Sequence, residues 1–165
     1  MFEKFTHSAG RAVFWARLEA GRLGSVAIEP EHLLFGFLAE DQGDSEQRIA
    51  GDHGGEPVGR IAILARDGLP FFSAELAAKL RQTLADAAHP GKSIPDTVDM
   101  PVSEPCRRAL IAAAEQHTEQ SKAHLLHILW ALISDTEMPV RGLLKSNGVT
   151  VEQVENEIRA RHSTE

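Results

Sequence analysis

A chain of 165 residues is long enough for one domain with its own hydrophobic core, and its formal net charge of −7 argues against nonspecific nucleic-acid binding, which relies on Lys and Arg to neutralise phosphates. The single cysteine, Cys106, excludes an internal disulfide and fits a reducing cytosol, and no apolar run approaches the length of a membrane-spanning helix. We therefore expect a cytoplasmic protein with neither nucleic-acid nor membrane partners. Abundant Ala and Leu and the absence of Tyr favour helices over strands.

Two helices are predicted near the start of the chain. Thr6 is a suitable N-cap for the first helix, because its hydroxyl oxygen can accept a backbone N–H of the first turn. Pro30 suits the first position of a second helix, where Glu29 and Glu31 complement the positive end of the helix dipole. This second helix is apolar on nearly every side, which is typical of a buried helix.

The following segments complete a first group of four helices. The polar, glycine-rich residues 43–57 predict a mobile loop, and Pro57 then opens a short third helix that Gly68 closes. Ser73 caps a fourth helix, whose leucines are spaced four residues apart. Residues 89–100 contain two prolines and few large apolar side chains, so they are predicted to form a linker.

The second half of the chain gives the same series of signals. Ser103 caps a fifth helix, the apolar run that starts at His124 begins a sixth, and Pro139 opens a seventh that ends at Gly148. Thr150, with a glutamine three residues later, forms the capping box of an eighth helix.

Matching residues recur at nearly constant offsets between the two halves, which indicates an internal repeat. Residues 6–13 match residues 103–110 at an offset of 97, and the His-Leu-Leu at residues 32–34 matches the one at 124–126 at an offset of 92. The insertions fall only between helices, as a structural repeat requires. We therefore predict an all-α fold of eight helices, arranged as two pseudo-symmetric four-helix repeats in a single domain. The predicted boundaries are residues 1–165 for the domain, 1–88 for repeat one, 89–100 for the linker and 101–160 for repeat two.

One short motif resembles a nucleotide-binding loop. Gly91, Lys92 and Ser93 reproduce the end of a phosphate-binding loop, but that motif needs a glycine where Asp86 stands. It also follows a strand, whereas the preceding segment here has the pattern of a helix. We therefore interpret these residues as part of the linker.

Histidine and cysteine side chains offer two further candidates for chemistry. His117, His124 and His127 could suggest a metal site, but no HExxH motif is present, and the match of His124 to His32 indicates a packing role. Cys106 matches an alanine of the first repeat, so it is expected to be a small packing residue rather than a nucleophile. We predict no catalytic residue, no cofactor and no metal ion.

Two stretches of the sequence resemble a known family. Residues 1–6 read MFEKFT, and the LG at residues 23–24 is followed by Ile28 and by EHLLFGFL at residues 31–38. They resemble the opening and the recurring signature of the N-terminal domain of the Clp ATPases, the unfoldases of the Clp protease. The resemblance extends to about Ile158 and implies eight helices in two repeats. The chain ends where a Clp ATPase would continue into its ATPase modules, so we expect a stand-alone protein.

The resemblance implies a function in protein recognition. It indicates a non-enzymatic module that binds polypeptide substrates or adaptor proteins, or that modulates a Clp unfoldase or protease. The alternative is a regulatory or ligand-sensing module that is unrelated to proteolysis.

The same resemblance implies candidate site residues. In the branch of the family that reads arginine-phosphorylated proteins, the residues that match Thr6 and Glu31 belong to the ligand site. The simpler interpretation of Glu31 is that it complements the helix dipole. In the second copy, Ser103 keeps the hydroxyl, but Ala123 stands where the signature has Glu. Since alanine can neither accept a side-chain hydrogen bond nor carry charge, we expect the second site to be degenerate and peptide binding to centre on Thr6 and Glu31.

Overall fold

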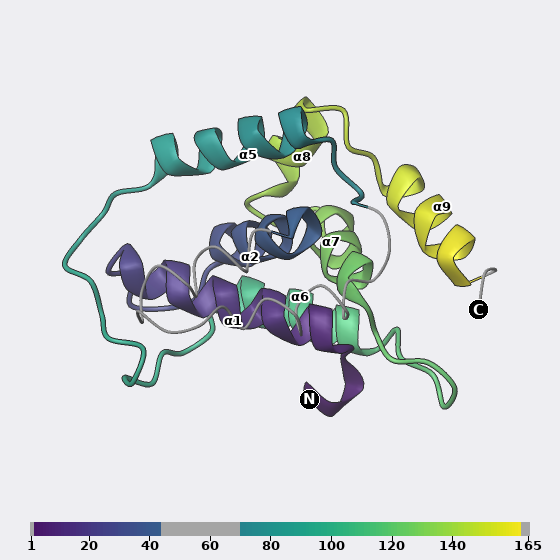
Figure 1. Cartoon of the computed structure of the whole chain (residues 1–165), viewed down its shortest axis with the longest axis horizontal. Helices are drawn as coiled ribbons and strands as arrows, with labels where there is room; N and C mark the ends of the chain where they lie inside the picture. The colour runs from purple at the N-terminus through teal and green to yellow at the C-terminus, as the bar shows by residue number, and fades with distance from the viewer. Residues whose placement is uncertain (1, 44–69, 163–165) are drawn as a thin grey trace.

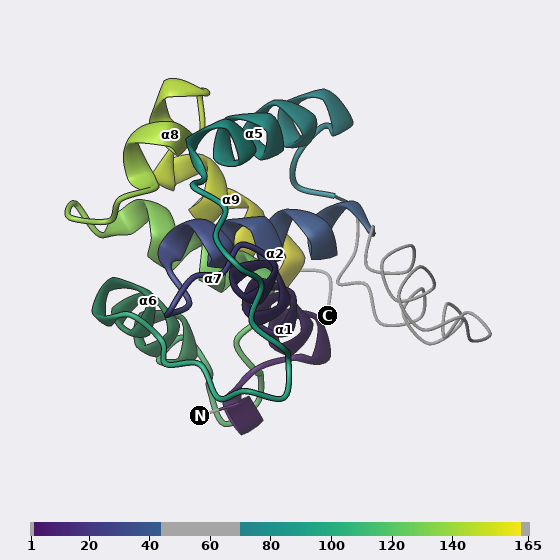
Figure 2. The same ribbon diagram turned by 90° about the vertical axis from the view of Figure 1, so that its left-hand side faces the viewer.

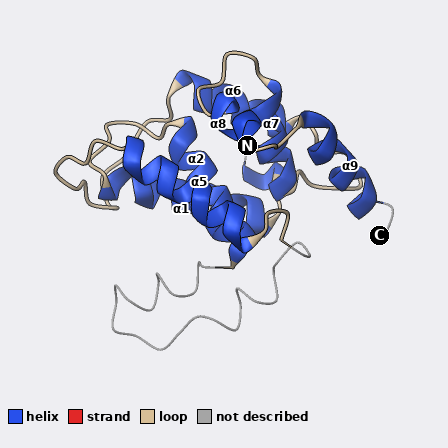
Figure 3. Ribbon diagram, turned by 90° about the horizontal axis from the view of Figure 1, so that it is seen from above, coloured by secondary structure: helices blue, strands red, loops and turns tan. Residues whose placement is uncertain are grey.

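The computed structural model describes residues 2–43 and 70–162, and within these ranges the protein is helical, with no strand (Figures 1 and 3). A short 3₁₀ helix, Phe2–Lys4, precedes seven α-helices. These are α1 (His7–Arg22), α2 (Pro30–Gln42), α5 (Ala74–Ala87), α6 (Glu104–Ala114), α7 (Leu125–Ser134), α8 (Arg141–Ser146) and α9 (Val151–His162). None of the helices in these ranges combines the length and the apolarity that crossing a bilayer requires.

The predicted all-α class is confirmed for the described part of the chain, but the predicted total of eight helices is not. The predicted third helix, which would run from Pro57 to Gly68, lies outside the described residues, as does nearly all of the predicted loop at 43–57. Residues 89–100, the predicted linker, contain no helix.

Polar side chains begin the helices where the sequence predicts. Thr6, Ser73 and Ser103 each accept a hydrogen bond from the backbone N–H three residues later, at 3.2–3.4 Å. Thr150 and Gln153 form the predicted capping box of α9, with bonds of 3.0 and 3.1 Å. Each of these bonds satisfies a backbone donor that the first turn of a helix leaves unpaired, so the caps fix where the helices start.

Helices α1 and α2 form a close antiparallel pair. Gly36 of α2 lies directly on the α1 backbone, since a Cβ added to it would stand 2.0 Å from the Ala12 carbonyl oxygen. An ion pair between Arg11 and Glu40 joins the beginning of α1 to the end of α2. The N-terminal ends of the two helices therefore lie at opposite ends of the pair, separated by the length of α1, which is ~24 Å for its 16 residues at about 1.5 Å per residue.

The core lies around α2 and α7, which pack against each other (Figure 2). Helix α2 also contacts α1, α5 and α6, and α7 also contacts α1, α6, α8 and α9. Fully buried side chains of the two central helices include Leu33, Leu34, Phe37, Leu38, Ile128, Leu129, Leu132 and Ile133. In Figure 1, α5 crosses above α2, and α9 lies at the edge of the molecule beyond α7.

The two halves of the chain are joined through the segments that precede their helices. The Thr6 amide donates to the Ala123 carbonyl at 2.9 Å. The Ile28 amide donates to the Pro101 carbonyl at 2.9 Å, and the Ser103 amide donates back to the Ile28 carbonyl at 3.0 Å. Two isolated parallel bridges result, one before α1 and α7 and one before α2 and α6. Each half therefore begins its first helix beside the second helix of the other half.

Histidine caps at the start of α2 and α7 align the two halves in a different register from the sequence match. In α2, Nδ1 of His32 accepts the Glu29 amide at 2.9 Å. In α7, Nδ1 of His127 accepts the His124 amide at 3.0 Å. His32 therefore corresponds to His127, and the predicted match of His32 to His124 is wrong. The error of three residues is close to one helical turn, so the apolar face of the helix looks almost the same in either register.

The corrected register changes the counterpart of Glu31. Glu31 is the second residue of α2, and the second residue of α7 is Leu126. Ala123 instead corresponds to Ile28, since both precede the helix and both make the bridge to the other half. The second half still has no carboxylate at this position, but Ala123 is not the residue that replaces it.

Candidate functional site

A cleft of about 890 Å³ lies between the C-terminal end of α1, the N-terminal end of α2, α5 and residues 89–91. Leu23, Phe35 and Leu84 contribute apolar surface to its lining. The charged and polar lining residues include Glu19, Arg22, Glu29, Glu31, His32, Arg81 and Gln82. The cleft thus combines an apolar surface with several carboxylates, as peptide and small-molecule sites commonly do.

The carboxylates of the cleft differ in how far they are already neutralised. Glu19 is buried, and both of its oxygens accept hydrogen bonds from the Arg22 guanidinium, at 2.7 and 2.9 Å. Glu29 is half-buried and caps α2 by accepting the His32 amide. Glu31, by contrast, is exposed in the first turn of α2. It is therefore the lining carboxylate most accessible to a cationic ligand.

The structure separates the two residues that the family resemblance pairs. Thr6 lies at the N-terminus of α1, beside Ala123, whereas Glu31 lies at the other end of the α1–α2 pair. The hydroxyl residue near Glu31 is Ser103, because the Ser103 amide is bonded to Ile28, which directly precedes the cap of α2. A site that used a capping hydroxyl together with Glu31 would therefore draw on both halves of the chain.

Cys106 lies in the first turn of α6, near the same junction, and it is fully buried. Burial, together with the charges of Glu29 and Glu31, raises the pKa of the thiol to about 12. The thiol is therefore protonated at neutral pH, which disfavours attack on a substrate.

The linker motif at Gly91 to Ser93 is built into the wall of the cleft. The Gly91 amide donates to the Leu23 carbonyl at 2.8 Å, and the Ile94 amide donates to the Gly21 carbonyl at 2.8 Å. A phosphate-binding loop needs backbone N–H groups that point at the ligand. Here the amides of Gly91 and Ile94, which flank Lys92 and Ser93, attach the linker to the end of α1, which disfavours a nucleotide site.

His32 is a buried histidine in the lining of the cleft. Burial lowers the pKa of His32 below its ordinary value of 6.5, and Glu31, Glu19 and Glu29 only partly oppose this effect. Above pH 6.5 the imidazole is neutral in both the native and the unfolded protein. As the pH falls below 6.5, the unfolded chain takes up a proton that native His32 does not, so stability is lost with falling pH.

We predict that His32→Gln will flatten the loss of stability between pH 7 and pH 5. One proton taken up on unfolding changes the free energy of unfolding by at most ~1.4 kcal/mol per pH unit. This value is the upper limit of the difference in slope between wild type and variant. Urea denaturation at several pH values measures both slopes, and other titrating groups contribute equally to the two proteins. Parallel curves for the two proteins would show that His32 is not a source of the pH dependence.

The histidines that lie together are not the three that the sequence suggests. His117 follows α6, and its Nδ1 lies 2.7 Å from the carbonyl oxygen of Ala114, the last residue of that helix. His124 and His127 instead meet His162, the last residue of α9, and one ring nitrogen of each lies within 4.8 Å of the others. His162 was not predicted from the sequence, because no motif or residue spacing relates the end of α9 to the start of α7. Only the packing of α9 against α7 brings His162 close to the other two histidines.

Comparison with known proteins gives a consistent answer about the fold. No model of a known protein family matches the chain. A stretch of 42 residues is 48% identical to the chloroplastic chaperone protein ClpD1 of Oryza sativa subsp. japonica. It covers 26% of this chain and only 4% of that protein, so the similarity concerns a small part of the relative.

Two solved structures share the architecture over nearly the whole chain. The N-terminal domain of the caseinolytic protease associated chaperone ClpD from Arabidopsis thaliana has a TM-score of 0.58 and 25% identity, covering 96% of this chain and 99% of that one. A chain from structural investigations of a malarial protein secretion system has a TM-score of 0.63 at 16% identity, covering 96% and 94%, which shows the fold alone.

These comparisons and the helical architecture define a Clp N-domain-like module. Among the Clp chaperones, the similarity is to ClpD, in sequence over a short stretch and in structure over its N-terminal domain. The Clp N-domain-like fold is a non-catalytic domain.

Proposed function

We propose that this chain is a non-enzymatic peptide-binding module, which recognises polypeptide substrates or adaptor proteins and thereby modulates a Clp unfoldase or protease. The observation that carries the proposal is the cleft between α1, α2 and α5, with Glu31 exposed at its rim. The similarity of nearly the whole chain to the ClpD N-terminal domain supports the assignment to a Clp system.

The lining of the cleft favours a peptide with a cationic side chain next to apolar ones. Phe35 and Leu84 offer apolar surface, while Glu29 and Glu31 offer two carboxylates at the start of α2. An arginine guanidinium forms the strongest hydrogen bonds with such carboxylates, since both partners are charged. Glu19 contributes less, because Arg22 already occupies its oxygens.

Thr6 belongs to a separate part of this proposal. It lies beside Ala123 at the far end of α1, so it cannot contact a ligand group that also contacts Glu31 directly. We propose Glu31 as the main determinant of binding and Thr6 as a contact only for a ligand long enough to reach the start of α1. Ser103, at the start of α6, is the capping hydroxyl nearer to Glu31, but the hydroxyl residue that lines the cleft is Ser25.

We predict that Glu31→Gln will weaken binding of an arginine-containing peptide about tenfold or more. The reason is that a hydrogen bond to a charged partner contributes about 1.5–3 kcal/mol, and glutamine keeps the size of the side chain but removes the charge. Fluorescence polarisation with a labelled, unstructured peptide carrying one arginine among apolar residues measures the change. The same peptide with glutamine in place of arginine should bind both proteins equally weakly.

Glu119→Gln is the matched control, because Glu119 is exposed but does not line the cleft. Its affinity for the arginine peptide should equal that of the wild type. If Glu31→Gln binds as tightly as the wild type, or if only Thr6→Val loses affinity, then the cleft is not the binding site.

The second candidate is a regulatory or ligand-sensing function unrelated to proteolysis, and the size of the same cleft favours it, since about 890 Å³ is also the size of a small-molecule site. A pull-down from native extract with wild type and Glu31→Gln distinguishes the two. Enrichment of Clp subunits or of their clients, lost in the variant, supports the proteolytic function.

A further inference from the structure

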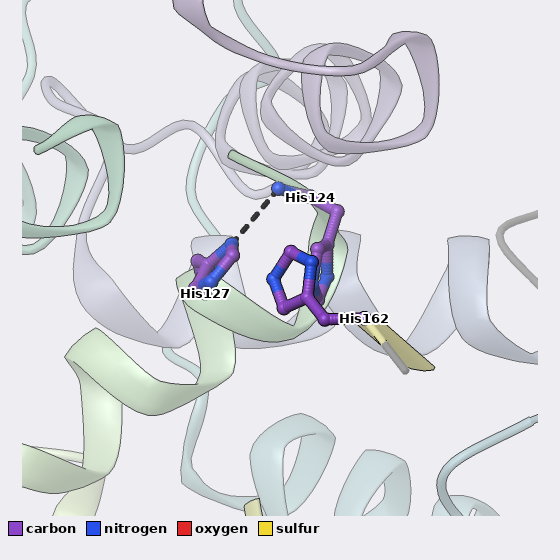
Figure 4. Close-up of side chains that lie close together, drawn as sticks. All are labelled: His124, His127 and His162. Carbon is purple, nitrogen blue, oxygen red and sulfur yellow. Dashed lines mark hydrogen bonds between the residues drawn. The ribbon is translucent and has the colours of Figure 1, made fainter. Parts of the chain in front are cut away.

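Three imidazole rings meet where the start of α7 contacts the end of α9. The ring centroids of His124 and His127 are 4.1 Å apart, and that of His162 lies 5.3 Å from His124 and 6.0 Å from His127. Figure 4 shows the three side chains converging, with His162 reaching across from α9. One ring nitrogen of each residue lies within 4.8 Å of the others.

Helix capping accounts for His127 and for one ring nitrogen of His124, but not for His162. His127 caps α7 just as His32 caps α2, so its presence follows from the repeat. His124 corresponds to Glu29 and likewise accepts the backbone amide three residues later, but its Nε2 is buried without a hydrogen-bond partner. A buried polar atom without a partner is costly, so an additional ligand at this point would remove a real energetic defect.

The chemistry of the three groups suits a metal ion. Imidazole is mostly neutral near pH 7, the form in which it donates a lone pair to a metal. The one nearby cation, among the groups that influence these rings, is Arg161, which is paired with Glu157 at 2.9 Å.

We propose that His124, His127 and His162 form a site for Zn²⁺ that links the end of α9 to the start of α7. Neutral imidazole nitrogens are ligands that zinc prefers, and three of them leave the fourth position of a tetrahedral site open to water. Zinc-bound nitrogens lie ~3.3 Å apart for bond lengths of about 2.0–2.1 Å, so the rings must close slightly. His162 allows this closure, because it is exposed and ends its helix.

Zinc binding must compete with the cap of α7. In the metal-free protein, Nδ1 of His127 accepts the His124 amide. Zinc at Nδ1 takes that lone pair, and zinc at Nε2 moves the ring proton onto Nδ1. In either case the His124 amide loses its acceptor. The Glu29 amide, which donates to His32 in the same geometry, keeps its acceptor.

Titration calorimetry of ZnCl₂ into the full, untagged and metal-free chain tests the site. We expect one zinc per chain, and an affinity at least about tenfold lower in His162→Gln, in line with the loss of a ligand or of its immediate support. His117→Gln is the control, because His117 lies outside the group and its ring contacts the carbonyl oxygen at the end of α6. It should bind zinc as the wild type does. Equal affinity in wild type and His162→Gln would overturn the proposal.

Amide NMR spectra of the wild type provide a second test that does not depend on any variant folding. On saturation with ZnCl₂, the His124 amide proton should shift strongly, whereas the Glu29 amide proton should stay in place. Replacing zinc by CoCl₂ should give the intense visible bands of a four-coordinate cobalt site. An unchanged His124 amide at saturating zinc would show that His127 is not a ligand and would refute the site.

Discussion

Replacing Gly36 by alanine should destabilise the protein by about 3 kcal/mol, at the upper end of the usual effect of overpacking. The added Cβ would stand 2.0 Å from the Ala12 carbonyl oxygen and 3.0 Å from the Ala16 nitrogen. These are backbone atoms of α1, so no side-chain rotation relieves the clash, and the two helices must move apart. That movement would also open the buried contacts of α2, where Leu33 and Phe37 are fully covered.

Gly10→Ala is the matched control for this substitution. Gly10 lies within α1, and an added Cβ there meets nothing within 4 Å. Alanine should therefore stabilise the protein by about 0.5–1 kcal/mol, because glycine loses more conformational freedom on folding into a helix. Urea denaturation followed by circular dichroism measures both variants. A Gly36→Ala protein as stable as the wild type would mean that α1 and α2 do not approach as closely as described.

Arg11→Met should also cost about 3 kcal/mol of stability. The Arg11 guanidinium forms hydrogen bonds with both oxygens of Glu40, at 3.1 and 3.2 Å from Nε, and the Glu40 side chain is only 4% exposed. Removing the arginine leaves a carboxylate buried without its counter-charge, which typically costs about 3–5 kcal/mol. The lower end applies here because the Arg11 side chain is 25% exposed, so water can partly solvate the site.

The second half of the chain provides the control for the ion pair. Arg108 and Asp135 form the corresponding pair between α6 and the end of α7, at 3.3 Å, but their side chains are 41% and 28% exposed. Arg108→Met should therefore cost less than about 1 kcal/mol, as exposed ion pairs usually do. The double variant Arg11→Met, Glu40→Met should recover part of the loss, since it removes the unpaired charge as well. If both single variants lose the same stability, burial does not determine the strength of these pairs.

Local signals were sufficient to predict the helical class of the described residues and the starting points of several helices, although α8 begins at Arg141 rather than at the predicted Pro139. Thr6, Ser73 and Ser103 cap their helices as predicted, because a capping hydroxyl acts on a backbone amide only three residues away. Pro30 begins α2 and Gly148 follows α8 with a positive φ for the same local reason. Interactions of this range depend on neighbouring residues alone, so they can be read from the sequence.

The register between the halves could not be read in this way. Matching the two His-Leu-Leu sequences gives a register that is wrong by three residues. The error is hard to detect, because a shift of nearly one helical turn leaves the apolar face of α7 in place. The cap hydrogen bonds and the bridges distinguish the registers, since His127 and not His124 accepts the amide three residues before it, and Ala123 makes the same kind of bridge as Ile28.

The sequence by itself determined the all-α class seen in residues 2–43 and 70–162, the helix caps there and the resemblance to the Clp N-terminal domain, because these depend on composition, periodicity and short-range bonds. Tertiary structure decided which side chains share a site. The bridges made by Ile28 and by Ala123 place the first helix of each half beside the second helix of the other half. Glu31 therefore lies near Ser103 and far from Thr6. The packing of α9 on α7 likewise brings His162 to His124. Contacts between residues so distant in the chain depend on how helices pack, and no local pattern encodes that arrangement.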